Sequence, residues 1–212
     1  MRHSKLALGI GVAVALACLA GCAKVRYPNY YLLNVPAASS STGRKTPLLG
    51  PVAVRQFGSP PFLREGPIVY RESPERLGFY HYDHWGLDPR RAVTTALVGE
   101  MRSRSAFQSV DLYDGSTGSD WIVSGTLDHL EEVDDGADVA IEVGVSARLN
   151  SVRTGEVLWQ DTCSKRVKLD KRSVPGVVAA MSREMASVVE SLVTSMLDRL
   201  STAASAQSLA RQ

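Results

Sequence analysis

The chain has 212 residues, of which 44% are hydrophobic and 22% charged, and its mean hydropathy is −0.06. These values exclude collagen-like, low-complexity and wholly disordered proteins, and they allow a packed core in one domain or two small ones. The 24 basic and 22 acidic residues give a net charge of +2, which provides no basic stripe for a nucleic acid. We therefore expect no DNA or RNA partner.

The N-terminus has the pattern of a secretory signal peptide. Arg2 and Lys5 precede an uncharged apolar stretch over residues 6–20. The following Leu19-Ala20-Gly21-Cys22 resembles the bacterial lipobox, in which a dedicated peptidase cleaves in front of the cysteine. That pattern implies diacylglycerol on the Cys22 thiol and a further acyl chain, such as palmitate, on its amine. Two or more chains hold a protein stably on a membrane without spanning it.

An uncleaved spanning helix is the alternative, because residues 6–23 are uncharged and reach the lower limit of a spanning length. The glycines and the small-residue end of the stretch argue against it. The cysteine is followed by Ala23 and not by the aspartate that usually retains lipoproteins in the inner membrane of enteric-type bacteria, so outer-membrane sorting is favoured. Cleavage removes Cys18 and acylation uses Cys22, which leaves Cys163 without a disulfide partner.

We divide the chain into a signal peptide over residues 1–21, a lipidated tether over 22–29, a domain over 30–204 and a disordered tail over 205–212. The domain is expected to be α+β. Its sheet is predicted to be largely antiparallel, with two helices, one central and one long and C-terminal, packed on one side.

In the first half of the domain, short aliphatic and aromatic runs predict strands. Pro60 and Pro61 predict a turn followed by an extended segment through Phe62 and Leu63. Asp88 and the proline after it predict a helix start, because the aspartate can accept from free backbone amides and proline needs no amide there. The predicted strands cover residues 30–35, 48–57, 68–71, 77–82 and 107–113, and the helix ends near Ser105.

In the second half, residues 139–150 alternate between aliphatic residues and mostly polar or small ones, which predicts a strand with one buried face. Turns at 134–137 and 153–156 join it to strands over 121–133 and 157–169, giving an antiparallel meander. A long helix is then predicted from Ser173 to about Ala204, with an apolar stripe that packs on the sheet rather than on a partner. The stripe consists of Val177, Met181, Met185, Val188, Leu192, Met196 and Leu200.

The candidate metal ligands are His81, Asp83 and His84, since imidazole and carboxylate both bind metals. On an extended strand, however, His84 points away from the other two. The acidic pairs 131–132 and 134–135 are interpreted as a solvated turn at the mouth of a hairpin. We therefore expect no metal site.

The sequence gives no better support for a catalytic site. The sequence contains no Gly-x-Ser-x-Gly elbow and no phosphate-binding loop. Cys163 is interpreted as inert packing rather than as a nucleophile. We expect no catalytic residues, and no cofactor other than the covalent lipid on Cys22.

Five residues are candidates for binding a partner. Some are of the types enriched at binding hot spots, and the others lie on a loop that prolines constrain. The alternative for each is a role within the chain, with Arg71 bonding a carboxylate or a backbone carbonyl, and Phe62 and Trp85 closing the core. The candidates are Phe62, Leu63, Tyr70, Arg71 and Trp85.

The order of several short motifs resembles the ABC-type transport auxiliary lipoprotein family, including its PqiC-like members. The resemblance spans nearly all of the mature chain, and its most specific part runs from Phe62 to Trp85. The motifs are Tyr30-Tyr31-Leu32-Leu33, Pro51-Val52-Ala53-Val54, Pro61-Phe62-Leu63, Pro67-Ile68-Val69-Tyr70-Arg71, Phe79-Tyr80 and His84-Trp85.

The resemblance implies a non-catalytic periplasmic lipoprotein that is an accessory part of an MCE system. In such systems an inner-membrane permease and ATPase couple to MCE proteins that move phospholipids or other apolar molecules across the envelope. The expected location is the periplasmic face of the outer membrane, where the protein would dock the MCE assembly and contact the permease and ATPase only indirectly. A structural or assembly lipoprotein of another envelope machine and an envelope enzyme are the alternatives. The sequence leaves the cargo and any homo-oligomer open.

Overall fold

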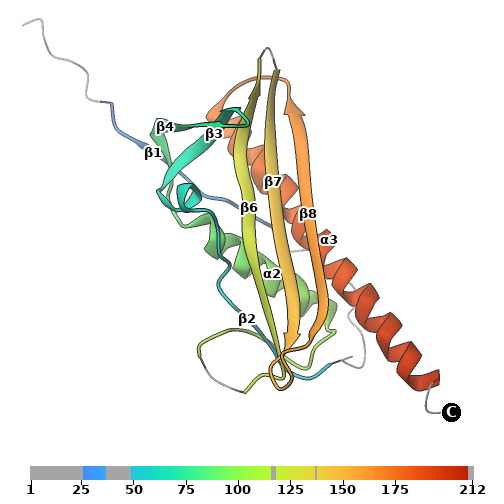
Figure 1. Cartoon of the computed structure of the whole chain (residues 1–212). Helices are drawn as coiled ribbons and strands as arrows, with labels where there is room; N and C mark the ends of the chain where they lie inside the picture. Colours follow the sequence, from blue (N-terminus) through green and yellow to red (C-terminus); the bar gives the residue numbers. More distant parts are fainter. Residues whose placement is uncertain (1–25, 37–48, 116–117, 137, 210–212) are drawn as a thin grey trace, which may run out of the picture.

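The structure is a computed structural model that describes residues 26–36, 49–115, 118–136 and 138–209. The predicted signal peptide, Cys22 and most of the loop after residue 36 therefore lie outside the described residues. One eight-stranded sheet is covered on one face by two helices (Figure 1). The predicted α+β class, with both helices on one side of the sheet, is confirmed.

The long meander forms as the sequence predicts. It consists of β6 (Trp121–Asp135), β7 (Asp138–Ser151) and β8 (Val157–Leu169), paired antiparallel in this order. The tight β6–β7 turn uses Gly136 at φ 73°, a backbone conformation that glycine adopts without steric cost. The alternate β7 residues predicted to form the buried face are each at most 9% exposed, namely Val139, Ile141, Val143, Val145, Ala147 and Leu149.

The sheet is largely antiparallel along the meander and the β3–β4 hairpin, as predicted, and short parallel pairs make it mixed. The second edge of β6 pairs in parallel with β2 (Val52–Val54) near its start and with β3 (Pro67–Ser73) near its end. Two further parallel pairs join β1 (Asn29–Tyr31) to β4 (Arg76–Trp85), and β2 to β5 (Val110–Leu112). Only β3 and β4 form the predicted antiparallel hairpin in this half. These partners lie far apart along the chain, so local turn signals do not determine them.

Several elements of the first half differ in length or type from the predictions. Where strands were predicted over 30–35, 48–57 and 107–113, β1, β2 and β5 are each only three residues long, and Leu49 and Phe107 form an isolated parallel bridge before β2 and β5. The segment predicted as extended is a 3-10 helix, η1 (Pro61–Arg64). Pro61 suits a first helical turn, and the Leu63 amide donates to the Pro60 carbonyl over 3.2 Å to close it.

Both helices begin where the sequence predicts. α2 (Pro89–Arg104) is capped by Asp88, whose side chain accepts from the Arg90 amide at 2.9 Å, and it ends at Ser105 in the left-handed conformation. α3 (Val174–Leu209) continues past the predicted end at Ala204, because no glycine or proline interrupts it. Its C-terminal turns extend beyond the sheet (Figure 1).

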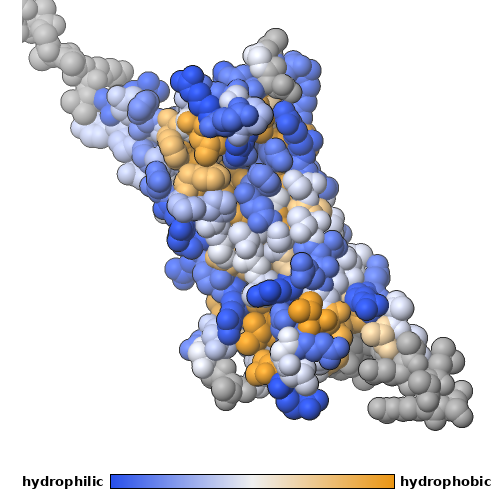
Figure 2. All heavy atoms as spheres, in the orientation of Figure 1, coloured by the Kyte–Doolittle hydropathy of each residue, from blue (hydrophilic) through white to orange (hydrophobic). Residues whose placement is uncertain are grey.

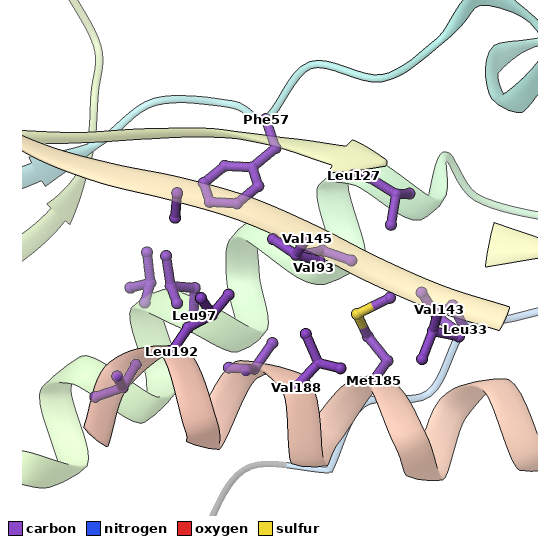
Figure 3. Packing of buried hydrophobic residues seen from close by; sticks show 14 of the residues in the cluster. Leu33, Phe57, Val93, Leu97, Leu127, Val143, Val145, Met185, Val188 and Leu192 are labelled. Carbon is purple, nitrogen blue, oxygen red and sulfur yellow. The ribbon is translucent and has the colours of Figure 1, made fainter. Parts of the chain in front are cut away.

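The core lies between the sheet and the helices. All seven residues of the predicted α3 stripe are at most 3% exposed. Figure 3 shows Met185, Val188 and Leu192 of α3 pointing toward the strands, with Val143 and Val145 of β7 above them. Burial of this continuous apolar layer holds α3 against the meander.

Candidate functional site

Arg71, a predicted partner-binding residue on β3, is bonded within the chain. Its guanidinium forms a bidentate pair with Glu131 of β6, with Nε–Oε1 at 2.8 Å and Nη2–Oε2 at 3.0 Å. A further N–H donates to the Pro74 carbonyl at 3.1 Å. The Glu131 side chain is fully buried, and its carboxylate raises the pKa of Arg71. The intramolecular alternative for Arg71 is therefore the role that the structure shows.

Tyr70 lies on the neighbouring position of β3 and is only partly buried. Its ring covers Gly78, its antiparallel partner on β4, because a Cβ at Gly78 would come within 2.2 Å of the ring. Tyr80 packs edge-on against Tyr70 with ring centroids 5.2 Å apart. The Tyr80 hydroxyl donates to Glu132 at 2.7 Å, and Arg172 also binds this carboxylate, Nε–Oε1, at 3.1 Å. Burial and the Glu132 hydrogen bond raise the pKa of Tyr80 well above its usual value.

The interpretation of Glu131 and Glu132 as a solvated turn is wrong. Their residues are 0% and 1% exposed, and they point to opposite faces of β6 because successive residues of a strand alternate. Glu131 is paired with Arg71 on the helix-free face, and Glu132 with Arg172 on the helix face. Each carboxylate is buried because an arginine neutralises it.

Leu63 and Trp85 do not present surface to a partner. They are 2% and 6% exposed and belong to the hydrophobic core, while Phe62 is partly buried and packs against it. The prediction that a proline-constrained loop displays Leu63 is corrected, because η1 turns this side chain inward. Of the five predicted residues, Phe62, Tyr70 and Arg71 keep part of their surface exposed.

The histidines of β4 do not combine with Asp83. The Asp83 carboxylate is buried and accepts from Asn29 Nδ2 at 3.0 Å and from the Tyr31 hydroxyl at 3.1 Å, both on β1. The His84 ring instead lies 3.2 Å from the His81 carbonyl oxygen. Asp83 thus serves to fasten β1 to β4.

A different group of possible metal ligands occurs within the described residues. One ligand atom each from His129, Glu131 and Glu142 lies within 4.8 Å of the others, because the β6–β7 register places Glu142 opposite Glu131. Both Glu131 oxygens are already bonded to Arg71, and His129 Nδ1 lies 3.4 Å from one of them. The group is organised around the Arg71–Glu131 ion pair. Hairpin register could have predicted it from the sequence.

Two adjoining hollows lie at the other end of the sheet, where β6 begins and β7 ends. The first, of about 370 Å³, and the second, of about 320 Å³, share Ser124 and Arg148 as lining residues. Arg148 Nε donates to the Ser124 hydroxyl at 3.3 Å. Arg55 stacks on the Tyr113 ring with 4.7 Å between its Cζ and the ring centroid. Both arginines are exposed.

Exposed apolar side chains also lie at this end of the sheet. Val152 lines the second hollow and is 42% exposed, Val157 at the start of β8 is 47% exposed, and Leu112 on β5 is 55% exposed. Figure 2, which looks onto the helix-free face, shows hydrophobic groups at this end of the molecule. The described chain begins at the opposite end, beside β1 and β4 (Figure 1). We call this region the distal surface and define it by Arg55, Leu112, Tyr113, Ser124, Arg148, Val152 and Val157.

The remaining cysteine gives no sign of chemistry. Cys163 lies on β8, is partly buried, and packs against the core as a free thiol. None of the described helices is both long and apolar enough to cross a membrane.

Comparison with known proteins identifies the class. The sequence model of the ABC-type transport auxiliary lipoprotein component matches residues 30–193, so the chain belongs to this family. No curated protein matches the sequence.

The fold is shared with solved structures at low identity. Protein XCC0632 from Xanthomonas campestris superposes with a TM-score of 0.70 at 16% identity, covering 84% of this chain and 99% of its own. A second crystal structure, of an uncharacterised protein, gives a TM-score of 0.62 at 17% identity, covering 79% of this chain and 97% of its own. The PelC dodecamer from Paraburkholderia phytofirmans gives only 0.47 at 16% identity, with 74% and 94% covered. The first two likenesses establish the fold alone.

Proposed function

We propose that the protein is a non-catalytic accessory lipoprotein of an MCE system of the ABC type, anchored in the outer membrane through Cys22 and docking the MCE assembly in the periplasm. The observation that carries the proposal is membership of the ABC-type transport auxiliary family, over residues 30–193. The lipobox-like sequence ending at Cys22 and the alanine after it support the anchor and its location.

We assign the docking contact to the distal surface. A lipid on Cys22 would hold the end of the domain near β1 and β4, and the distal surface lies at the opposite end (Figure 1). Exposed arginines and an aromatic ring beside apolar side chains are typical of binding hot spots. Among the residues predicted from the sequence, Arg71 is bonded to Glu131 and Trp85 is buried, so they support the fold instead.

The test is affinity purification from the detergent-solubilised envelope of the native host, followed by mass spectrometry. Wild type is expected to bring down an MCE protein from the outer-membrane fraction, and Cys22→Ala is expected to lose the outer-membrane location. A fully acylated wild type that recovers no MCE component would contradict the proposal and favour a structural lipoprotein of another envelope machine.

A matched pair of variants tests the docking surface. Arg55→Glu with Arg148→Glu reverses the charge of the distal surface, and Arg199→Glu changes an exposed arginine on α3. The double variant is expected to lose the MCE protein while remaining acylated and folded, and Arg199→Glu is expected to retain it. Equal recovery by the two would move the contact away from the distal surface.

A further inference from the structure

Large hydrophobic side chains gather where the described chain begins, at the end of the domain away from the distal surface. Tyr27, Tyr30 and Leu32 are 78%, 68% and 62% exposed, and Tyr82 and Leu87 are 40% and 46% exposed. We call these five residues the N-terminal surface. Such a group of exposed apolar residues is unusual on a protein that only meets water.

The pairing of β1 with β4 fixes two of these side chains, Tyr30 and Tyr82, on one face. Tyr30 is the parallel partner of His84, and their ring centroids lie 5.9 Å apart. Tyr82 lies two residues before His84 on β4 and so points to the same side. The Arg26 guanidinium stacks 4.6 Å from the centroid of the Tyr82 ring.

Leu32 joins the group around Gly86, just beyond β4. A Cβ at Gly86 would lie 3.4 Å from the Tyr30 Cβ and 3.5 Å from Leu32 Cδ2, so both residues pack closely over the glycine backbone. The Gly86 amide also donates to the Tyr31 carbonyl at 2.7 Å. Leu87 follows directly in the chain.

The opposite face of the same strands is packed and bonded. Tyr31 and Asn29 both donate to Asp83, and Leu33 and Trp85 are each 6% exposed in the core. The exposure of Tyr30 and Tyr82 is therefore a consequence of the strand register, which holds these two rings in fixed positions.

We propose that the N-terminal surface lies on the lipid bilayer and orients the domain on it. This inference rests on the proposed acylation of Cys22. Cys22 precedes Tyr27 by five residues, which span at most about 18 Å when fully extended, so this surface cannot be far from the head groups.

The composition of the N-terminal surface fits the interfacial region of a bilayer. Tyrosine places its ring among the upper acyl chains and its hydroxyl among the head groups, and it is enriched at this depth. Leu32 and Leu87 add apolar area, and Arg26 beside Tyr82 suits anionic phosphates. The contact would direct the distal surface away from the membrane, toward the periplasm.

The test uses acylated, full-length mature protein in vesicles of phosphatidylethanolamine and phosphatidylglycerol, with or without brominated acyl chains. Tyr27→Trp places a fluorophore on the N-terminal surface, and Val157→Trp places one on the distal surface. Bromine quenches tryptophan on contact, so we expect the emission added by Tyr27→Trp to fall at least about twofold in brominated vesicles and that of Val157→Trp to stay unchanged.

A second pair of variants tests the surface as a whole. Tyr30→Ser with Leu32→Ser in the Tyr27→Trp background is expected to reduce the quenching, whereas Leu112→Ser with Val152→Ser is expected to leave it unchanged. Intact mass measured on the same samples reports the acyl chains on Cys22.

Each outcome has a separate meaning. Acylated protein with equal quenching at positions 27 and 157 overturns the inference but leaves the proposed anchor intact. A tryptophan at position 27 that is shielded from acrylamide but not quenched by bromine would show that a second copy or another segment of the chain covers the surface, which also overturns it. A mature chain without acyl groups overturns the proposed anchor and the inference together.

Discussion

At the β6–β7 hairpin end of the sheet, Glu131 and Glu132 are buried and each is bonded to an arginine, whereas at the start of β6 Arg55 and Arg148 are exposed around open hollows. The two ends of the sheet therefore use charge in two ways. Near the hairpin, charge fastens β3 and the segment before α3 to the meander. At the distal surface it faces solvent, where a partner can reach it. Hot-spot residue types occur at both ends, so burial and bonding are needed to distinguish a structural charge from an available one.

The strongest test of the hairpin end is Arg71→Met. This change leaves the buried Glu131 carboxylate without its bidentate partner, and we expect the free energy of unfolding to fall by about 3–5 kcal/mol. Urea denaturation followed by tryptophan fluorescence measures it. Arg71→Met with Glu131→Gln removes the uncompensated charge and should recover much of the loss. A single variant as stable as wild type would show that Arg71 is not structural.

Tyr80→Phe tests the other face of β6. We expect a loss of about 1 kcal/mol at neutral pH, since Glu132 keeps its contact with Arg172. The fold raises the pKa of Tyr80. The protonated hydroxyl therefore stabilises the fold fully at a pH below about 10, the pKa of tyrosine in the unfolded chain, and this contribution is lost as the pH rises above that value.

The measurement for Tyr80 is the free energy of unfolding from about pH 8 to about pH 11. The alkaline decline should be shallower in Tyr80→Phe than in wild type. Tyr82→Phe is the control, because that ring is exposed and should leave the decline unchanged. Parallel curves for wild type and Tyr80→Phe would exclude Tyr80 as the titrating group.

Asp88→Ala is expected to have an intermediate effect on stability, since the capping carboxylate is 36% exposed. Loss of the cap should cost about 1 kcal/mol or less. Arg90 holds the pKa of Asp88 below its usual value of 3.8, so the contribution is present above that value and disappears as the pH falls below it. Thermal unfolding at neutral pH and near pH 3 measures the difference in melting temperature between wild type and variant, and this difference should close in acid. A gap that persists in acid would mean that the effect is not from the carboxylate.

Arg148→Glu is expected to have the smallest effect on folding. The side chain is exposed, so the free energy of unfolding should change by no more than about 0.5 kcal/mol. Recovery of the MCE protein should nevertheless fall severalfold if the distal surface is a hot spot. A large loss of stability would remove the contrast between the two ends.

Much of the second half of the chain was predictable. The alternation in β7 and the stripe of α3 specify which face is buried, and Asp88 followed by proline marks the start of α2. The partners of β2 and β3 were not predictable, because three to seven residues carry too little pattern to select an edge of β6. The depth of Glu131 was missed for the same reason, since its burial depends on an arginine sixty positions away.

The sequence by itself determined the class of fold, the meander, both helix starts and the lipobox-like pattern, because each depends on residues close together in the chain. Tertiary structure alone decided which charges are bonded and which hydrophobic residues stay exposed. Trp85 of β4 turns inward while Tyr30 of the paired strand β1 remains outside, because strand pairing across distant segments selects the face on which each side chain lies.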